Sequence, residues 1–165
     1  MKAIDLIHRG KQLSDEFTIK FLEDMHDAPM TQPTALGGNH PLWVAGHLAV
    51  SEGQIPAMLF GESNPVEHWK PLFDGGTQPT TDASDYPPYE EVLRTYRDLR
   101  ERNLKLLDEI GDEGLDRPTA APMPGAENYF DTFGQVFLTM TMHQEFHCGQ
   151  IADARRAAGR KPLFF

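Results

Sequence analysis

The residues best suited to chemistry in this 165-residue chain are its seven histidines, which stand against a single cysteine, Cys148. A lone cysteine cannot form a disulfide within the chain, so the composition is typical of a reducing compartment. If the protein binds a transition metal, we therefore expect imidazole nitrogens to be its main ligands.

Two of the histidines have the spacing of a metal-binding pair. His143 and His147 are four residues apart in a segment with helical periodicity, so their side chains project from one face about one turn apart. The same stripe continues through the apolar residues Val136, Met140 and Ile151, which predicts that the pair points into the protein. Zinc-like ions take at least three protein ligands, so two histidines leave the site incomplete.

His47 is the best candidate for the third ligand. Val44 and Val50 make its stripe apolar, and Gly46 would allow another helix to approach closely. His40 is the weaker choice because it precedes a proline, where helical geometry is disfavoured. Three neutral imidazoles leave a coordination position open for water or substrate, an arrangement typical of catalytic metal sites.

The alternative is a protein whose histidines are ordinary core residues, because a spacing of four residues also occurs by chance on many helices. From spacing alone, both interpretations stay open. Three further histidines fall on exposed or loop-like positions, where we expect them to be solvated: His8, His26 and His68.

Other polar residues near the histidines are candidates for supporting roles. Gln150 follows His147 by three residues, so it either orients a ligand or bound water or forms an ordinary interhelical hydrogen bond. Asn103 interrupts an apolar stripe and either faces the metal or fixes the helix register. Cys148 lies about 100° around the helix from His147, which predicts a packed thiol, and Glu145 also points away. The sequence therefore nominates ligands but no general acid or base.

Four segments must position these residues, and each has helical periodicity: 3–27, 41–60, 89–110 and 132–158. The last opens with a capping-box pattern, Thr132 to Gln135, and stops at Gly159, whereas Pro56 is expected to kink the second segment or end it early. No segment has the alternation of a β-strand. We predict an all-α fold, an antiparallel four-helix bundle, as a single domain over residues 1–165.

Connections rich in Gly and Pro separate the helical segments, at residues 28–41, 61–88 and 111–125. The middle connection, between the second and third helices, is too long for a tight turn. Loops of this length in compact domains are often functional. We expect this one to pack onto the bundle through four aromatic residues: Trp69, Phe73, Tyr86 and His68.

Charge and hydropathy exclude several classes of partner. The chain has 15 Lys and Arg against 25 Asp and Glu, a formal net charge of −10. Binding to nucleic acid or to an anionic membrane needs an excess of clustered cations, so we expect neither. No apolar run approaches the roughly 18 residues of a membrane span, and charged residues interrupt the N-terminal apolar stretch, which argues against a signal peptide. We expect a cytoplasmic protein.

Three sequence runs resemble the DinB/YfiT-like family. They are HQEFHCGQI at residues 143–151, RRAAGRKP at 155–162 and NHPLWVAGHL at 39–48. The helix order over the whole chain, with the long middle connection, is also similar to that family. The resemblance implies a four-helix bundle that holds a divalent metal ion through one histidine of the second helix and the pair on the fourth. Transferred by position, these are His47, His143 and His147.

The resemblance also implies a function. Characterised relatives include transferases and isomerases that use small thiols such as bacillithiol or mycothiol, so thiol-dependent transfer is the leading prediction and metal-dependent hydrolysis an alternative. The partners would be a small-molecule thiol or another small substrate, and zinc or nickel the first candidates for the metal. A further alternative is a metal-binding homodimer without catalytic turnover, whose interface Phe164 and Phe165 would join.

Overall fold

The computed structural model describes residues 1–35, 38–121 and 125–164, and within these ranges the regular structure is helical, with one isolated β-bridge between Pro118 and Thr132. No helix in the described ranges is long and apolar enough to cross a membrane. The helices are α1 (Ala3–Asp24), α2 (Pro41–Phe60), α3 (Lys70–Phe73), α4 (Tyr89–Gly114), α5 (Glu127–Phe130) and α6 (Phe133–Ala157), with 3-10 turns η1 (Glu67–Trp69) and η2 (Ala83–Asp85).

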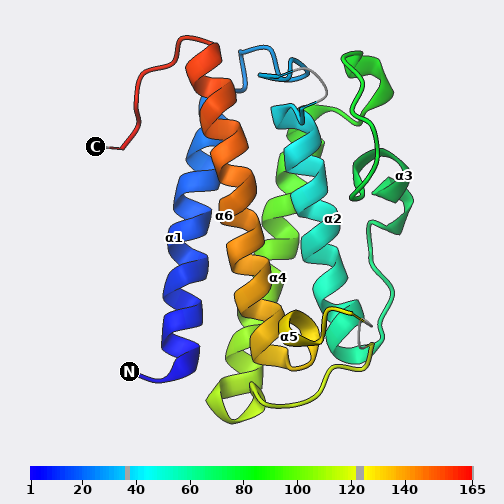
Figure 1. Ribbon diagram of the computed structural model, residues 1–165, viewed down its shortest axis with the longest axis vertical. Helices are drawn as coiled ribbons and strands as arrows, with labels where there is room; N and C mark the ends of the chain where they lie inside the picture. The colour runs from blue at the N-terminus through cyan, green and yellow to red at the C-terminus, as the bar shows by residue number, and fades with distance from the viewer. Residues whose placement is uncertain (36–37, 122–124, 165) are drawn as a thin grey trace.

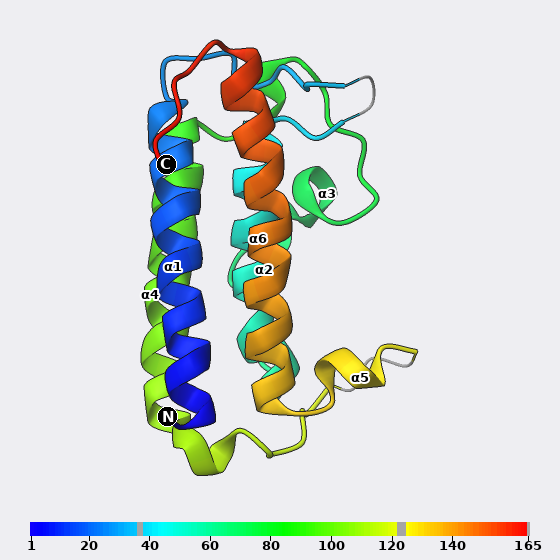
Figure 2. The same ribbon diagram turned by 60° about the vertical axis from the view of Figure 1, so that its left-hand side comes forward.

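The four long helices form a bundle, as predicted (Figure 1). Around it, α1 packs on α4, α4 on α2, α2 on α6 and α6 on α1. Figure 2 shows α1 in front of α4 and α6 in front of α2. The connection 61–88 climbs back along the outside of α2, so α2 and α4 run in the same direction, opposite to α1 and α6. Antiparallel packing therefore holds for α1–α4 and α2–α6, whereas the other two neighbouring pairs are parallel.

Helix α2 begins and ends on residues suited to those positions. Pro41 occupies the first turn, where its missing N–H is harmless, and the His40 ring accepts a hydrogen bond from the backbone N–H of Trp43 at 3.0 Å. At the other end Gly61 adopts the left-handed conformation with φ 74°. These caps explain why the observed bounds match the predicted segment 41–60.

Pro56 does not end α2, contrary to one of the two outcomes expected for it. Proline has no N–H, so the carbonyl of Glu52, four residues earlier, loses its helical donor. The side-chain amide of Asn103 on α4 donates to that carbonyl at 2.9 Å and to the Glu52 carboxylate at 2.7 Å. A neighbouring helix therefore completes the hydrogen bonding of α2 at its proline.

Helix α6 starts with the predicted capping box. The hydroxyl of Thr132 accepts from the N–H of Gln135 at 3.3 Å, and the side chain of Gln135 accepts from the N–H of Thr132 at 2.9 Å. The chain leaves the helix at Gly159, with φ 73°. Helix α4 is broken at Gly111, with φ 65°, which agrees with the predicted end of regular helix at Ile110.

The long connection packs on α2, as its aromatic residues predict. Trp69, Phe73 and Tyr86 are buried, whereas His68 is exposed. Gly46 permits this contact rather than a close approach between helices, because a Cβ at that position would overlap the Phe73 ring. With the connection on its outer side, every residue of α2 from 41 to 50 is buried.

A layer of buried polar side chains divides the apolar core into two clusters and touches all four long helices. Arg100 of α4 forms ion pairs with Glu52 of α2 and with Asp15 of α1, the latter at 2.6 Å. Gln144 of α6 donates to Asp15 at 3.1 Å, and the fully buried Lys11 lies 3.8 Å from Glu52. Removing one charged member of such a layer leaves an uncompensated buried charge, so the loss of any one of them is expected to be strongly destabilising.

Candidate metal centre

Helices α2 and α6 bring together the three histidines selected by spacing and by family resemblance. His47 projects from α2, and His143 and His147 project from α6. The Nε2 atom of His143 lies 3.1 Å from Nε2 of His47 and 3.1 Å from Nε2 of His147. Nitrogen ligands on a tetrahedral zinc ion, each about 2.0–2.1 Å from the metal, are about 3.3 Å apart. Both of these distances are close to that value, and the ligand atoms of all three histidines lie within 4.8 Å of one another, so the three can approach a single metal ion.

For His47 and His147, a hydrogen bond at Nδ1 determines which of the two ring nitrogens carries the proton. Nδ1 of His47 lies 2.7 Å from the backbone carbonyl of Phe73, which can only accept, so this Nδ1 carries the proton. Nδ1 of His147 donates in the same way to Oε1 of Gln150 at 2.9 Å. Both Nε2 lone pairs are then directed at the cluster, which is the arrangement that carbonyl and carboxylate acceptors impose on metal-binding histidines.

The donor set of the cluster suits a cation better than it suits hydrogen bonding. Because the Nε2 atoms of His47 and His147 both present lone pairs, at most one proton, on Nε2 of His143, is available for the two 3.1 Å contacts. Nδ1 of His143 is buried and has no partner within the described residues. A divalent ion would accept all three lone pairs at once, so the residues present fit the metal.

Burial keeps these imidazoles neutral. It lowers the pKa of His143 to about 4, helped by the charges that His147 and His47 would carry. Burial likewise lowers the pKa of His147 to about 4, against the opposing effect of the hydrogen bond that its ring donates to Gln150. The pKa of His47 is also lowered by burial. Neutral imidazole is the form that binds metal, so no proton has to leave these rings at neutral pH.

Residues of the connection 61–88 contact the part of α2 that carries His47. The indole of Trp43 stacks on the His47 ring, with centroids 4.7 Å apart, and its Nε1 donates to Thr77 at 2.9 Å. One turn earlier, Nε2 of His40 contacts the carbonyl of Thr80 at 2.8 Å. This support has no sequence signature, because backbone carbonyls of Phe73 and Thr80 provide two of the three acceptors and the fold of the connection places all three.

The remaining candidates take structural positions. His40 caps α2 and is not part of the cluster. His8, expected to be solvated, is only partly exposed and pairs with Asp108 at 2.8 Å, whereas His26 is exposed. Asn103 joins α4 to α2 through Glu52, the kind of contact that its alternative role in helix register requires.

The lone cysteine takes no part in the cluster. Cys148 is buried, and burial raises the pKa of its thiol to about 11, which agrees with a packed, unreactive thiol. The neighbouring residue expected to point away, Glu145, is exposed.

A cavity of about 400 Å³ lies beside the cluster, with His143 in its wall. Met58, Phe130 and Met140 form an apolar side, and Lys70 and Asp74 of the long connection contribute opposite charges. These two charged residues have no sequence pattern that links them to the histidines, because only the folded connection places them in the same lining as His143. We call this space the histidine cavity.

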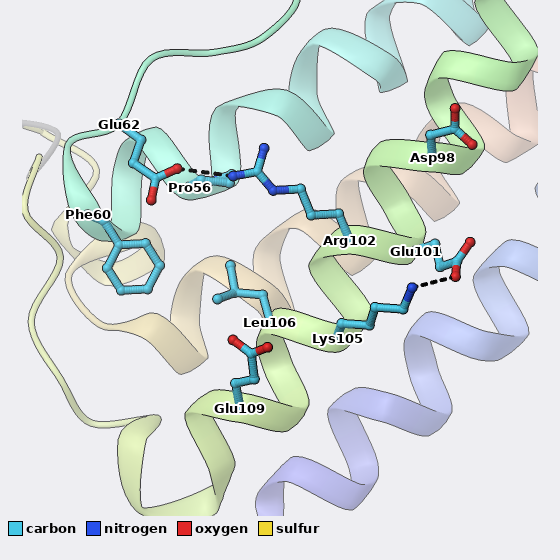
Figure 3. Close-up of a pocket in the computed structure, with 9 residues that line it drawn as sticks. All are labelled: Pro56, Phe60, Glu62, Asp98, Glu101, Arg102, Lys105, Leu106 and Glu109. Atoms are coloured by element: carbon cyan, nitrogen blue, oxygen red, sulfur yellow. Dashed lines mark hydrogen bonds and ion pairs between the residues drawn. The ribbon is translucent and has the colours of Figure 1, made fainter.

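A larger cavity, of about 550 Å³, lies between α2 and α4 and has no histidine in its lining (Figure 3). Its cations are already paired: Arg102 with Glu62 at 3.1 Å and Lys105 with Glu101 at 2.7 Å. We call it the acidic cavity, because Glu109 and Asp98 add further negative charge (Figure 3). No group in it has the arrangement of a catalytic site.

Comparison with known proteins supports the fold and establishes the family. The structure is similar to YfiT from Bacillus subtilis, described as a probable metal-dependent hydrolase with an unusual four-helix bundle topology, with a TM-score of 0.67 and 18% sequence identity over 96% of this chain and 89% of that one. Among curated proteins, none matches this chain significantly in sequence. Residues 15–151 match the family model of the DinB superfamily. The chain therefore belongs to the DinB superfamily.

Proposed function

We propose that this protein is a metal-dependent enzyme that activates a small nucleophile at His47, His143 and His147 and directs it at a substrate held in the histidine cavity. The observation that carries the proposal is that His143 belongs both to the cluster of converging Nε2 atoms and to the cavity wall. When bound, a divalent ion supplies Lewis acidity that lowers the pKa of a coordinated thiol or water, so that thiolate or hydroxide forms near neutral pH. Zinc and nickel are the first candidates.

The protein's own residues have separate tasks in this scheme. Phe73 and Gln150 hold the His47 and His147 rings with Nε2 directed at the cluster. The buried imidazoles are neutral, so they leave the positive charge of the metal available to an anionic nucleophile. The stacked Trp43 covers one face of His47, and His143 faces the histidine cavity, from which we expect the substrate to approach.

We take thiol-dependent transfer as the leading reaction, on the strength of the sequence resemblance, and hydrolysis as the alternative, which the description of YfiT favours. Both reactions place the same requirement on the three histidines. They differ in whether the nucleophile is a small thiol or water, so one set of assays separates them.

The test is an assay of protein prepared without a histidine tag and loaded with zinc or nickel. Transfer of cysteine, glutathione and other small thiols to 1-chloro-2,4-dinitrobenzene would be measured beside hydrolysis of 4-nitrophenyl acetate. We expect wild type to be active and His147→Ala to fall to the uncatalysed rate, with His8→Ala as a control that keeps activity. Equal rates for wild type and His147→Ala would rule out catalysis by this site.

A second candidate, a homodimeric metal-binding bundle, is favoured by an apolar stripe on α6. Leu138, Met142 and Phe146 are spaced by four residues and are 52%, 65% and 70% exposed. Phe164, expected at such an interface, instead packs on Phe17 of its own chain at 4.6 Å, and Phe165 lies outside the described residues. Sedimentation of wild type and Met142→Glu tests this role: we expect a dimer that the substitution dissociates, whereas a monomeric wild type would exclude it.

A further inference from the structure

We infer that the histidine cavity selects an amphipathic anion, a substrate with an apolar body and a carboxylate that pairs with Lys70. The inference rests on the proposed function, because it concerns the molecule that the activated nucleophile would attack. It adds a substrate class and a specificity-determining residue, neither of which follows from the three histidines.

The apolar body is indicated by one side of the cavity. Met58 at the end of α2, Phe130 in α5 and Met140 in α6 contribute large apolar side chains from three separate elements. Two of them are methionines, whose flexible thioethers adapt to differently shaped ligands. Burying an alkyl or aryl group against this side would provide most of the binding free energy.

The charged group is indicated by Lys70, which also lines the cavity. Its side chain is 29% exposed, and its partner Glu67, at 3.0 Å, is 63% exposed. An ion pair this open to water contributes little stability, so a ligand carboxylate can replace Glu67 at small cost. Lys70 lies three residues before Phe73, the residue whose carbonyl orients His47, so the anion site and the nucleophile site belong to one short segment.

The balance of charge favours an anion over a cation. Among the described residues that line the cavity, Asp74 is the one carboxylate. It offsets Lys70, and one of its oxygens already accepts from the N–H of Gly75 at 3.0 Å. The three imidazoles are neutral ligands, so a bound divalent ion would add two positive charges that no ligand cancels. The cavity is then a positive region in a protein whose formal net charge is −10.

The acidic cavity provides an internal control for this argument. It also contains a lysine paired with a glutamate, Lys105 with Glu101, at the similar distance of 2.7 Å (Figure 3). Glu109 and Asp98 surround that pair with negative charge, and no cluster of metal-ligating histidines lies beside it. A lysine–glutamate pair alone therefore does not define an anion site, and Lys105→Met is the control that makes the same substitution in a more exposed pair at the other cavity.

The experiment compares three probes that share one apolar body: 4-phenylbutyrate, 4-phenylbutanol and 4-phenylbutylamine. Their binding to the zinc-loaded protein, and to the protein after chelation, would be measured by titration calorimetry at low salt. We expect the carboxylate to bind about three- to tenfold more tightly than the alcohol in both forms, and this preference to shrink as salt is added.

Three variants test whether Lys70 causes the preference for the carboxylate. Lys70→Met should remove the preference for the carboxylate while leaving binding of the alcohol unchanged, and Lys70→Arg should restore it. Lys105→Met should have no effect. Tightest binding by the amine, no binding by any of the three probes, or an unchanged preference in Lys70→Met would overturn the inference.

Metal content and turnover distinguish this inference from the proposed function. Lys70→Met should bind zinc as wild type does, because Lys70 is not a member of the histidine cluster. If the metal-dependent rates survive but the carboxylate preference is absent, the substrate class is wrong and the proposed function stands. If the preference is present but His147→Ala retains full activity, the proposed function is wrong and the anion site stands.

Discussion

The larger of the two cavities in this bundle is the one less suited to chemistry. The acidic cavity is larger, about 550 Å³ against 400 Å³, yet its cations are paired with neighbouring acids and exposed to water. The histidine cavity is smaller, but His143 in its wall belongs to a cluster of three imidazoles whose ligand atoms lie within 4.8 Å of one another. The difference teaches that a cavity's capacity for chemistry depends on metal-binding nitrogen atoms held in place beside it, and not on its volume.

The largest expected effect concerns where a metal ion binds. His47→Ala should abolish stoichiometric zinc binding, because two imidazoles and solvent hold zinc far more weakly than three. Glu109→Gln in the acidic cavity should leave the stoichiometry unchanged. Elemental analysis of protein prepared without an affinity tag checks both. A lower zinc content in Glu109→Gln, with an unchanged content in His47→Ala, would contradict zinc binding at the histidine cluster.

The next effect compares two arginines that lie two residues apart on α4. Arg100 is buried with Glu52 and Asp15, whereas Arg102 pairs with Glu62 at the acidic cavity with about half of its side chain exposed. Arg100→Met should lower the free energy of unfolding by about 3–5 kcal/mol, because it leaves buried carboxylates uncompensated. Arg102→Met should cost about 0–1 kcal/mol. Urea denaturation measures both, and equal losses would contradict the distinction.

A smaller effect is expected from the acceptor behind His147. Gln150→Leu should weaken zinc binding about 10- to 100-fold, because the Nδ1 proton of His147 loses its acceptor. Gln150→Glu should retain tight binding, because a carboxylate also accepts. Gln54→Leu is the control, since Gln54 lines the histidine cavity but interacts with Asn64 at 3.5 Å. Competition with a chromophoric chelator gives the affinities, and unchanged affinity in Gln150→Leu would contradict this role.

The smallest effects are those of pH on two lysines. Burial lowers the pKa of Lys11 to about 8 from the ordinary 10.5, so between these values the unfolded chain holds more protons than the folded one. Wild type should therefore gain stability relative to Lys11→Met as pH rises through this window. Glu101 raises the pKa of the exposed Lys105, so that lysine's contribution should have the opposite sign and be lost at high pH. Urea denaturation at several pH values checks both signs.

Local patterns were sufficient to predict the elements that carry the site. The spacing of His143 and His147, the capping box at Thr132 and the proline at the start of α2 each act over one or two turns, and each has the expected structure. The direction of α4 could not be predicted in this way. It depends on the path of residues 61–88, which long-range packing determines, and that path makes α4 parallel to α2.

The rest of the site depends on contacts between residues distant in sequence. Lys70 and Asp74 have no pattern that indicates a cavity, because α5 and α6, more than 50 residues later, complete it. Asn103 was singled out as a polar residue in an apolar stripe, but its partner is a carbonyl that Pro56 leaves without a donor. Such a pairing becomes visible only when both helices are in place.

The two acceptors behind the metal ligands make those ligands unequally vulnerable to mutation. The acceptor of His147 is the side-chain oxygen of Gln150, so a single amino-acid substitution can remove it. The acceptor of His47 is the main-chain carbonyl of Phe73, which every amino acid at that position would retain. Drift in sequence can therefore erode the α6 half of the site one residue at a time, whereas the α2 half fails only when the backbone of the connection moves.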